Sequence, residues 1–278
     1  MFQYFNKLIE QNHEICLNDP LKHKNIIINY WSVLADFILF IISWVFLSFN
    51  YRKLKPIKIL AEKSGVLRLL RIILATLGWI YIAIRYEQNG VPFGRFLIYQ
   101  TRFLTENFFM YFTLYYTIIS ICDYFEKPKS SRLLNLFLTS NMFGTILVVF
   151  GFWLVAAPLA YYANFKDSHI DIDSWKWLDL LTHLPGAFIV FIEYYLIEKK
   201  YLISFNYSTL FLVFMFLSAY SILLYFFQFY EFICWIPYDG LLTSWKLKFF
   251  GITFVSMLFF VTRKIIHLFN KPLNTFKH

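Results

Sequence analysis

The stretch YSTLFLVFMFLSAYSILLYFFQF, residues 207–229, contains no charged side chain. A helix of about 20 apolar residues is long enough to cross the roughly 30 Å hydrocarbon core of a bilayer. The whole chain has this character, because 59% of its 278 residues are hydrophobic and only 15% are charged. Soluble domains carry about a quarter charged residues. Most of the chain must therefore face lipid or other apolar helices.

Six further stretches have the length and composition of membrane spans. They lie near residues 30–49, 67–86, 98–122, 133–163, 179–197 and 247–262. No alternating β-barrel pattern is present, so the backbone polar groups must be satisfied inside helices. The sequence therefore predicts an all-α polytopic, multi-pass membrane protein with seven transmembrane helices.

Lysine and arginine are distributed unevenly between the two sides of this arrangement. Fourteen lie in the predicted loops 51–66, 123–132 and 198–206 and in the tail 263–278, whereas seven lie on the opposite side. Segments rich in Lys and Arg remain on the cytoplasmic side of a membrane. We therefore expect these four segments on the cytoplasmic or matrix-like side and the N-terminus on the other.

Tryptophan supports the predicted boundaries of the spans. The tryptophans at the predicted outer ends are Trp31, Trp175, Trp177, Trp235 and Trp245. Tryptophan is enriched where a membrane meets water. The net charge of +9 then fits a topology signal and attraction to anionic membrane lipids, rather than nucleic-acid binding.

Nothing in the sequence indicates a metal or an organic cofactor. The three cysteines, Cys16, Cys122 and Cys234, lack metal-ligand or disulfide spacing, and we expect free thiols in apolar surroundings. A di-iron lipid desaturase would need clustered histidines, but only His183 of six histidines lies in a predicted span.

The basic stretch YRKLKPIKILAEKSG at 51–65 separates the first predicted span from six spans joined by short loops. Short loops favour antiparallel neighbouring helices. We expect residues 1–66 to comprise an amphipathic surface helix at 1–16, an extra transmembrane anchor and the basic loop. Residues 67–267 form the predicted six-helix core, and 268–278 form a polar tail.

Two polar residues fall at similar depth in predicted spans. Thr105 lies about eight residues, and His183 about five residues, from the outer ends of their spans, roughly 7–12 Å below the membrane boundary at about 1.5 Å per residue. Polar and ionisable residues inside lipid are costly and often functional. A histidine that takes the proton of a threonine hydroxyl makes it a nucleophile for acyl transfer. The alternative, that both residues only bond across helices, stays open.

Residues near this pair are candidates for supporting roles. Asp179 precedes His183 by four residues, on the same helical face, where its carboxylate can orient the imidazole. Pro185 opens the helix beside the histidine, because proline lacks a backbone donor. Arg102 and Asn107 flank Thr105 and are candidates for positioning a lipid head group or stabilising an oxyanion.

The segment from Phe103 through Leu104 and Thr105, with Asp123 eighteen residues after the threonine, resembles the threonine-bearing helix of a known family. This family comprises the androgen-induced and androgen-dependent TFPI-regulating proteins, integral membrane hydrolases of fatty-acid esters of hydroxy fatty acids. Tyr86 and Pro92, upstream of the threonine, also match. The resemblance covers roughly residues 67–267.

Two further elements carry the same resemblance. Trp177 and Leu178 are followed by His183 and then, ten residues on, by Glu193. The tryptophan of WIPYDGL, Trp235, resembles one in the last outer loop of the family. The resemblance implies that Thr105 is the nucleophile and His183 its base, with no cofactor, in an endoplasmic reticulum or plasma membrane.

A hypothesis of another class is a catalytically idle accessory subunit of a large membrane complex, for example a mitochondrial respiratory assembly. The extra span and the N-terminal segment favour it, because residues 1–66 would then contact partner subunits. Departures from the family pattern also favour it, since Tyr99 and Gln100 replace a glycine pair and Pro185 comes early. This hypothesis places the chain in the mitochondrial inner membrane.

Overall fold

The computed structural model describes residues 30–54, 57–59, 65–89, 93, 96–97, 104–125, 129–151, 205–229 and 244–269. The helices of twenty or more residues in these ranges are α2 (Tyr30–Asn50), α3 (Gly65–Asn89), α5 (Leu104–Tyr124), α6 (Arg132–Gly151), α10 (Tyr207–Phe229) and α12 (Trp245–Phe269). A short 3-10 helix, η2 (Tyr51–Lys53), and two strands, β1 (Ile57–Ile59) and β2 (Lys129–Ser131), complete the described elements. The predicted helical class is confirmed for this part of the chain.

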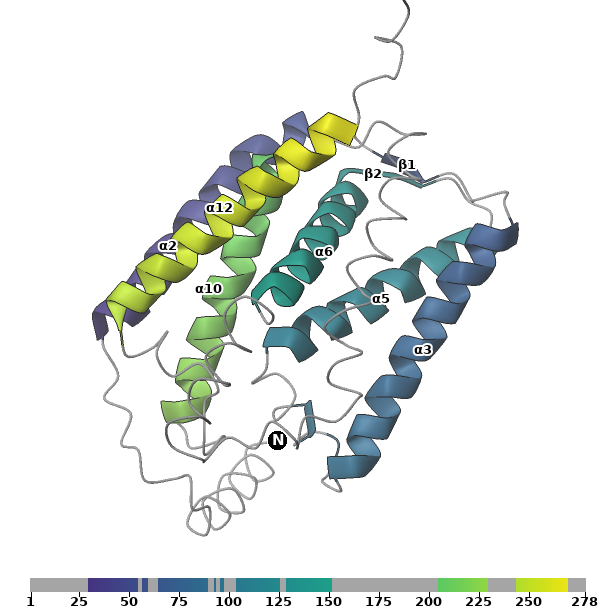
Figure 1. The fold of residues 1–278 in the computed structure, drawn as a ribbon, viewed down its shortest axis with the longest axis horizontal. Coiled ribbons are helices and arrows are strands. Elements are labelled where there is room, and N and C mark those ends of the chain that lie inside the picture. The colour runs from purple at the N-terminus through teal and green to yellow at the C-terminus, as the bar shows by residue number, and fades with distance from the viewer. Residues whose placement is uncertain are drawn as a thin grey trace, which may run out of the picture.

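The helices form one bundle, with α2 and α12 on one flank and α3 on the other (Figure 1). Helix α10 packs against α2 and α6, and α5 packs against α6 and α3. Hydrogen bonds cross these contacts: Tyr111 of α5 bonds with Ser140 of α6 at 2.8 Å, and Thr209 of α10 donates to Thr139 of α6 at 2.9 Å. Such bonds between hydroxyl groups are typical of helices that pack inside a membrane.

The described parts of the basic segments 51–66, 123–132 and 263–278 lie at one end of this bundle (Figure 1). Strand β1 pairs antiparallel with β2, with Ile57 opposite Ser131, which joins the predicted loops 51–66 and 123–132. The two strands are an addition to the prediction, because three residues are too short to show an alternating pattern. At the same end, Arg263 of α12 stacks on the ring of Tyr207, which begins α10. This agrees with the grouping predicted from charge for the described parts of 51–66, 123–132 and 263–278, whereas the lysines of 198–206 lie outside the described residues.

Helix α6 ends at the opposite end of the bundle from the start of α10 (Figure 1). The span predicted at 179–197 lies outside the described residues, as do the predicted surface helix 1–16 and all but the first two residues of the predicted polar tail 268–278.

Four of the described helices are long and apolar enough to cross a membrane. These segments are Tyr30–Lys53, Arg68–Glu87, Tyr207–Phe227 and Trp245–Ile266. Helix α2 shows why lipid is the fitting solvent, because Ser32, Asp36 and Ser43 are buried while Phe37 and Ile41 are exposed. A helix on the surface of a soluble protein has the reverse polarity. The described helices are compatible with a multi-pass membrane protein.

The other two helices do not reach that length of apolar sequence, so the seven-span architecture stays a prediction. Helix α6 has a shorter apolar segment, Leu136–Gly151, because Arg132 and Asn135 lie in its first turn. Helix α5 is rich in tyrosine and threonine and carries Glu106 and Asp123 near its ends. It packs between α3 and α6, while Leu114, Ile118 and Ile121 on its outer side remain exposed.

The core is a layer of large side chains between α5, α6, α10 and α12. Tyr116, Ile119, Leu138, Phe143 and Phe259 are all fully buried in it. The rings of Phe143 and Phe259 meet edge to face, with centroids 5.5 Å apart, a favourable geometry for aromatic pairs. Because α5 contributes large side chains to this core, the core fixes the position of α5 and of the residues at its two ends.

Gly144 of α6 leaves space for a neighbouring aromatic ring in this core. A Cβ atom at this position would overlap the ring of Phe108, which is itself buried. We expect Gly144→Ala to destabilise the protein, because overpacking a core costs about 1–3 kcal/mol, against a gain of roughly 1 kcal/mol in helix propensity. Gly151→Ala is the matched control, since nothing lies within 4 Å of its added methyl group. Thermal unfolding in detergent micelles measures both, and an unchanged Gly144→Ala midpoint would contradict the expectation.

Candidate functional site

Thr105 lies in the first turn of α5, which begins at Leu104. The span predicted at 98–122 places the threonine about eight residues from a boundary, and this depth stays a prediction because residues 98–103 lie outside the described residues. The first-turn backbone N–H groups have no acceptor one turn earlier in the helix, so Thr105 lies among amides that can bind an anion.

Glu106, the next residue, connects this turn to α3 through a hydrogen bond and an ion pair. Its Oε1 accepts a hydrogen bond of 2.8 Å from the hydroxyl of Tyr81, and the guanidinium of Arg85 lies 3.6 Å away. Arg85 Nε in turn donates to the Tyr81 oxygen at 3.0 Å. A carboxylate in the first turn also interacts favourably with the helix dipole. These three residues fix the position of the turn that carries Thr105.

The other predicted site residues are only partly described. Asn107 is half-buried in the same turn as Thr105 and is engaged in further interactions. For Thr105 itself the structure describes the backbone alone. The remaining candidates lie outside the described residues: Arg102, Asp179, His183, Glu193 and Trp235. The pairing of Thr105 with His183 therefore stays a prediction.

Asp123, which matches the family pattern, lies at the opposite end of α5. Its side chain is buried, and Arg71 of α3 donates from Nη1 to both of its oxygens, at 3.0 and 2.8 Å. Eighteen residues of helix separate it from Thr105 by about 27 Å. Asp123 therefore holds α3 against α5 and is out of reach of the threonine.

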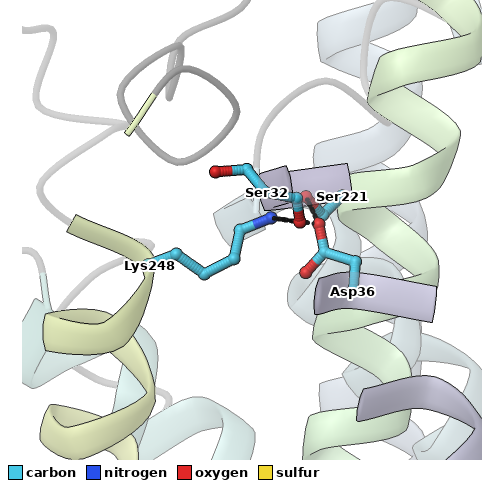
Figure 2. Close-up of polar contacts among 4 residues, drawn as sticks. All are labelled: Ser32, Asp36, Ser221 and Lys248. Atoms are coloured by element: carbon cyan, nitrogen blue, oxygen red, sulfur yellow. Dashed lines mark hydrogen bonds and ion pairs between the residues drawn. The ribbon is translucent and has the colours of Figure 1, made fainter. Parts of the chain in front are cut away.

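A second buried ion pair joins three helices at the end of the bundle where α2 and α12 begin (Figure 1). Asp36 of α2 pairs with the ammonium group of Lys248 of α12, and Ser221 of α10 donates to Asp36 Oδ2 at 2.6 Å. Lys248 also donates to the backbone carbonyl of Ser32 at 2.6 Å. Figure 2 shows the lysine reaching from α12 to these two acceptors on α2. All four residues are buried.

This cluster of buried residues was not predicted in the sequence analysis, although the sequence contains ionisable residues that indicate it. Asp36 is the single acidic residue of the span 30–49, and Lys248 lies at the start of the span 247–262. Ionisable residues inside membrane segments usually face the interior of the bundle and pair with one another. Applied to Asp36, that rule predicts a buried partner, but it does not identify Lys248.

The structure describes some of the tryptophans and cysteines that the sequence analysis named. Trp31 and Trp245 are exposed at the starts of α2 and α12, at one end of the bundle, as predicted. Cys122 is a buried free thiol, whereas Cys16, Cys234, Trp175 and Trp177 lie outside the described residues. Among the residues that the structure describes, no three His, Cys, Asp or Glu side chains gather as metal ligands.

Comparisons with protein-family models, with curated proteins and with solved structures find no match. The fold and composition are compatible with a helical, multi-pass membrane protein, and ionisable residues are buried between its described helices.

Proposed function

We propose that this chain is a membrane-embedded hydrolase of fatty-acid esters of hydroxy fatty acids, similar to the androgen-induced and androgen-dependent TFPI-regulating proteins. Its catalytic core would be the six-helix unit 67–267 within a seven-span protein. The observation that best supports the proposal is the position of Thr105 in the first turn of α5, which Tyr81 and Arg85 fix through Glu106. A nucleophile needs such fixed geometry.

In the proposed reaction, His183 takes the proton from the Thr105 hydroxyl, and the threonine oxygen attacks the ester carbonyl carbon. The amides of the first turn, with Asn107, stabilise the oxyanion of the tetrahedral intermediate. Its collapse breaks the ester bond, and His183 returns the proton to the departing hydroxy fatty acid. Water, activated by His183, then hydrolyses the acyl-threonine and releases the second fatty acid.

The other predicted residues have supporting roles in this scheme. Asp179 would orient the imidazole of His183, with Glu193 and Trp235 in supporting positions that the resemblance implies. Arg102 would bind the free carboxylate of the hydroxy fatty acid, because guanidinium groups bind carboxylates well. Substrate would enter from the bilayer, and no metal or organic cofactor takes part.

The test is hydrolysis of a fatty-acid ester of a hydroxy fatty acid by the purified chain in nanodiscs. Thr105→Ala and His183→Ala should each lower the rate by at least roughly 100-fold, since a positioned acid–base group contributes about 100- to 10,000-fold. Thr253→Ala is the matched control, because Thr253 is exposed on α12 and bonds only to the carbonyl of Phe249. Mass spectrometry should detect an acyl group on Thr105. Hydrolysis that survives both substitutions would refute the proposal.

One observation favours the alternative of an accessory subunit. Helix α2 is tied into the bundle by Asp36 yet exposes large apolar side chains along its outer face, among them Trp31, Phe37 and Trp44. Residues 1–66 would contact partner subunits of a larger membrane complex through this face. A chain that shows no hydrolysis, co-purifies with one large complex from its native membrane and crosslinks to it through α2 would support this function.

A further inference from the structure

The two helices joined by the buried pair of Asp36 and Lys248 run in the same direction (Figure 1). Arg52 follows Asp36 by sixteen residues, and Lys264 follows Lys248 by sixteen residues. Similar lengths of chain, each about 24 Å at 1.5 Å per residue of α-helix, place Arg52 and Lys264 toward the same end of the bundle. Positive side chains from two segments far apart in sequence therefore lie at one end of the bundle.

Four cations lie at this end of the bundle, which we call the basic end of α2 and α12. Arg52, Lys53 and Lys264 are exposed, and Arg263 is half-buried, with its guanidinium 4.6 Å from the centre of the Tyr207 ring. Neither η2 nor α12 contains an acidic residue. The one acidic residue of α2, Asp36, lies at the other end of the helix and is paired with Lys248. Within these elements the four positive charges are not neutralised.

The surface next to these cations is apolar. Phe49 of α2 is 76% exposed, and Phe260, Val261 and Ile265 of α12 are also exposed. These side chains lie within about one turn of Arg52 or Lys264 along their helices. Lipid chains can lie along such a surface, whereas nucleic acid or an acidic peptide would leave it in water.

From this juxtaposition we propose that the basic end of α2 and α12 binds the head group of an anionic phospholipid. Its phosphate accepts hydrogen bonds from Arg52 and Lys264, and its acyl chains lie against Phe49 and Ile265. Arg263, already stacked on Tyr207, supplies a less mobile positive charge. This inference does not depend on the proposed hydrolase.

The test measures binding of phosphatidylglycerol to the full-length chain in neutral detergent by native mass spectrometry. Lys264→Gln should weaken binding about fivefold, the effect of one lysine near a membrane surface. Arg52→Gln with Lys264→Gln should weaken it roughly 25-fold if the two effects add. Lys246→Gln is the matched control, because Lys246 is exposed on the same helix at its opposite end, and it should leave binding within about twofold.

Several outcomes would overturn the proposal. Equal losses for Lys264→Gln and Lys246→Gln would show a general effect of net charge rather than a site. Equally tight binding of zwitterionic phosphatidylcholine would show that charge does not select the lipid. Displacement of the lipid by equimolar glycerophosphate would identify a site for a soluble phosphate and not for a lipid. Phe49→Ser should weaken phosphatidylglycerol without changing the unfolding temperature, and no effect would exclude the apolar half of the site.

Discussion

Replacement of Asp36 by alanine is expected to lower the free energy of unfolding by about 3–5 kcal/mol, because it leaves a buried ammonium without its counter-ion. Lys248 would retain the carbonyl of Ser32 as an acceptor, but a neutral carbonyl does not balance a charge. Lys248→Met should have a similar effect, since it leaves the Asp36 carboxylate buried with only the hydroxyl of Ser221. Thermal or denaturant unfolding of the purified chain in micelles measures the loss.

The double variant Asp36→Leu with Lys248→Met separates a paired charge from a general loss of packing. Replacing both members of a buried pair by apolar residues is often neutral or stabilising, so most of the stability should return. Lys246→Met controls for the loss of a positive charge near the start of α12, because Lys246 is exposed. If the effects of the two single substitutions simply add, the residues do not interact and the pair is not the stabilising element.

The pair of Arg71 and Asp123 should show the second large effect. Both side chains are buried, and one guanidinium nitrogen bonds to both carboxylate oxygens. Arg71→Met removes the two hydrogen bonds that this guanidinium donates to a buried carboxylate, and we expect a loss of about 3–5 kcal/mol in the free energy of unfolding. Asp123→Asn should cost less, because the amide oxygen still accepts a hydrogen bond from Arg71.

Arg68→Met, one turn earlier on α3, is the control for this experiment. Arg68 is half-buried, and partly exposed charges contribute about 0–1 kcal/mol. Asp123→Asn should also retain hydrolysis of the ester substrate in molecules that remain folded, because Asp123 lies far from Thr105 along α5. Loss of hydrolysis at unchanged stability would contradict a purely structural role for Asp123.

Features that depend on one segment of the chain could be predicted from the sequence, whereas contacts between distant segments could not. Apolar runs identified the positions of α2, α3, α10 and α12, because the cost of exposing a helix backbone and of burying charge in lipid acts residue by residue. Lysine and arginine grouped the loops at one end of the bundle, and the pairing of β1 with β2 agrees with this grouping. Helix α5 is described from Leu104 onward, so the first six residues of the span predicted at 98–122 lie outside the described residues.

Composition and apolar runs alone predict a helical membrane protein, with which the described helices are compatible, and they identify Thr105 and its neighbours as chemical candidates. Only the tertiary structure decides that Asp36 meets Lys248, 212 residues later in the chain, and that Glu106 is held by Tyr81. The physical reason is that the membrane acts on each segment separately. A buried charge, in contrast, is stabilised by a residue of another helix, and the packing of the helices decides which residue that is. Which helices become neighbours depends on the shapes of all their surfaces, including the space that Gly144 leaves for Phe108.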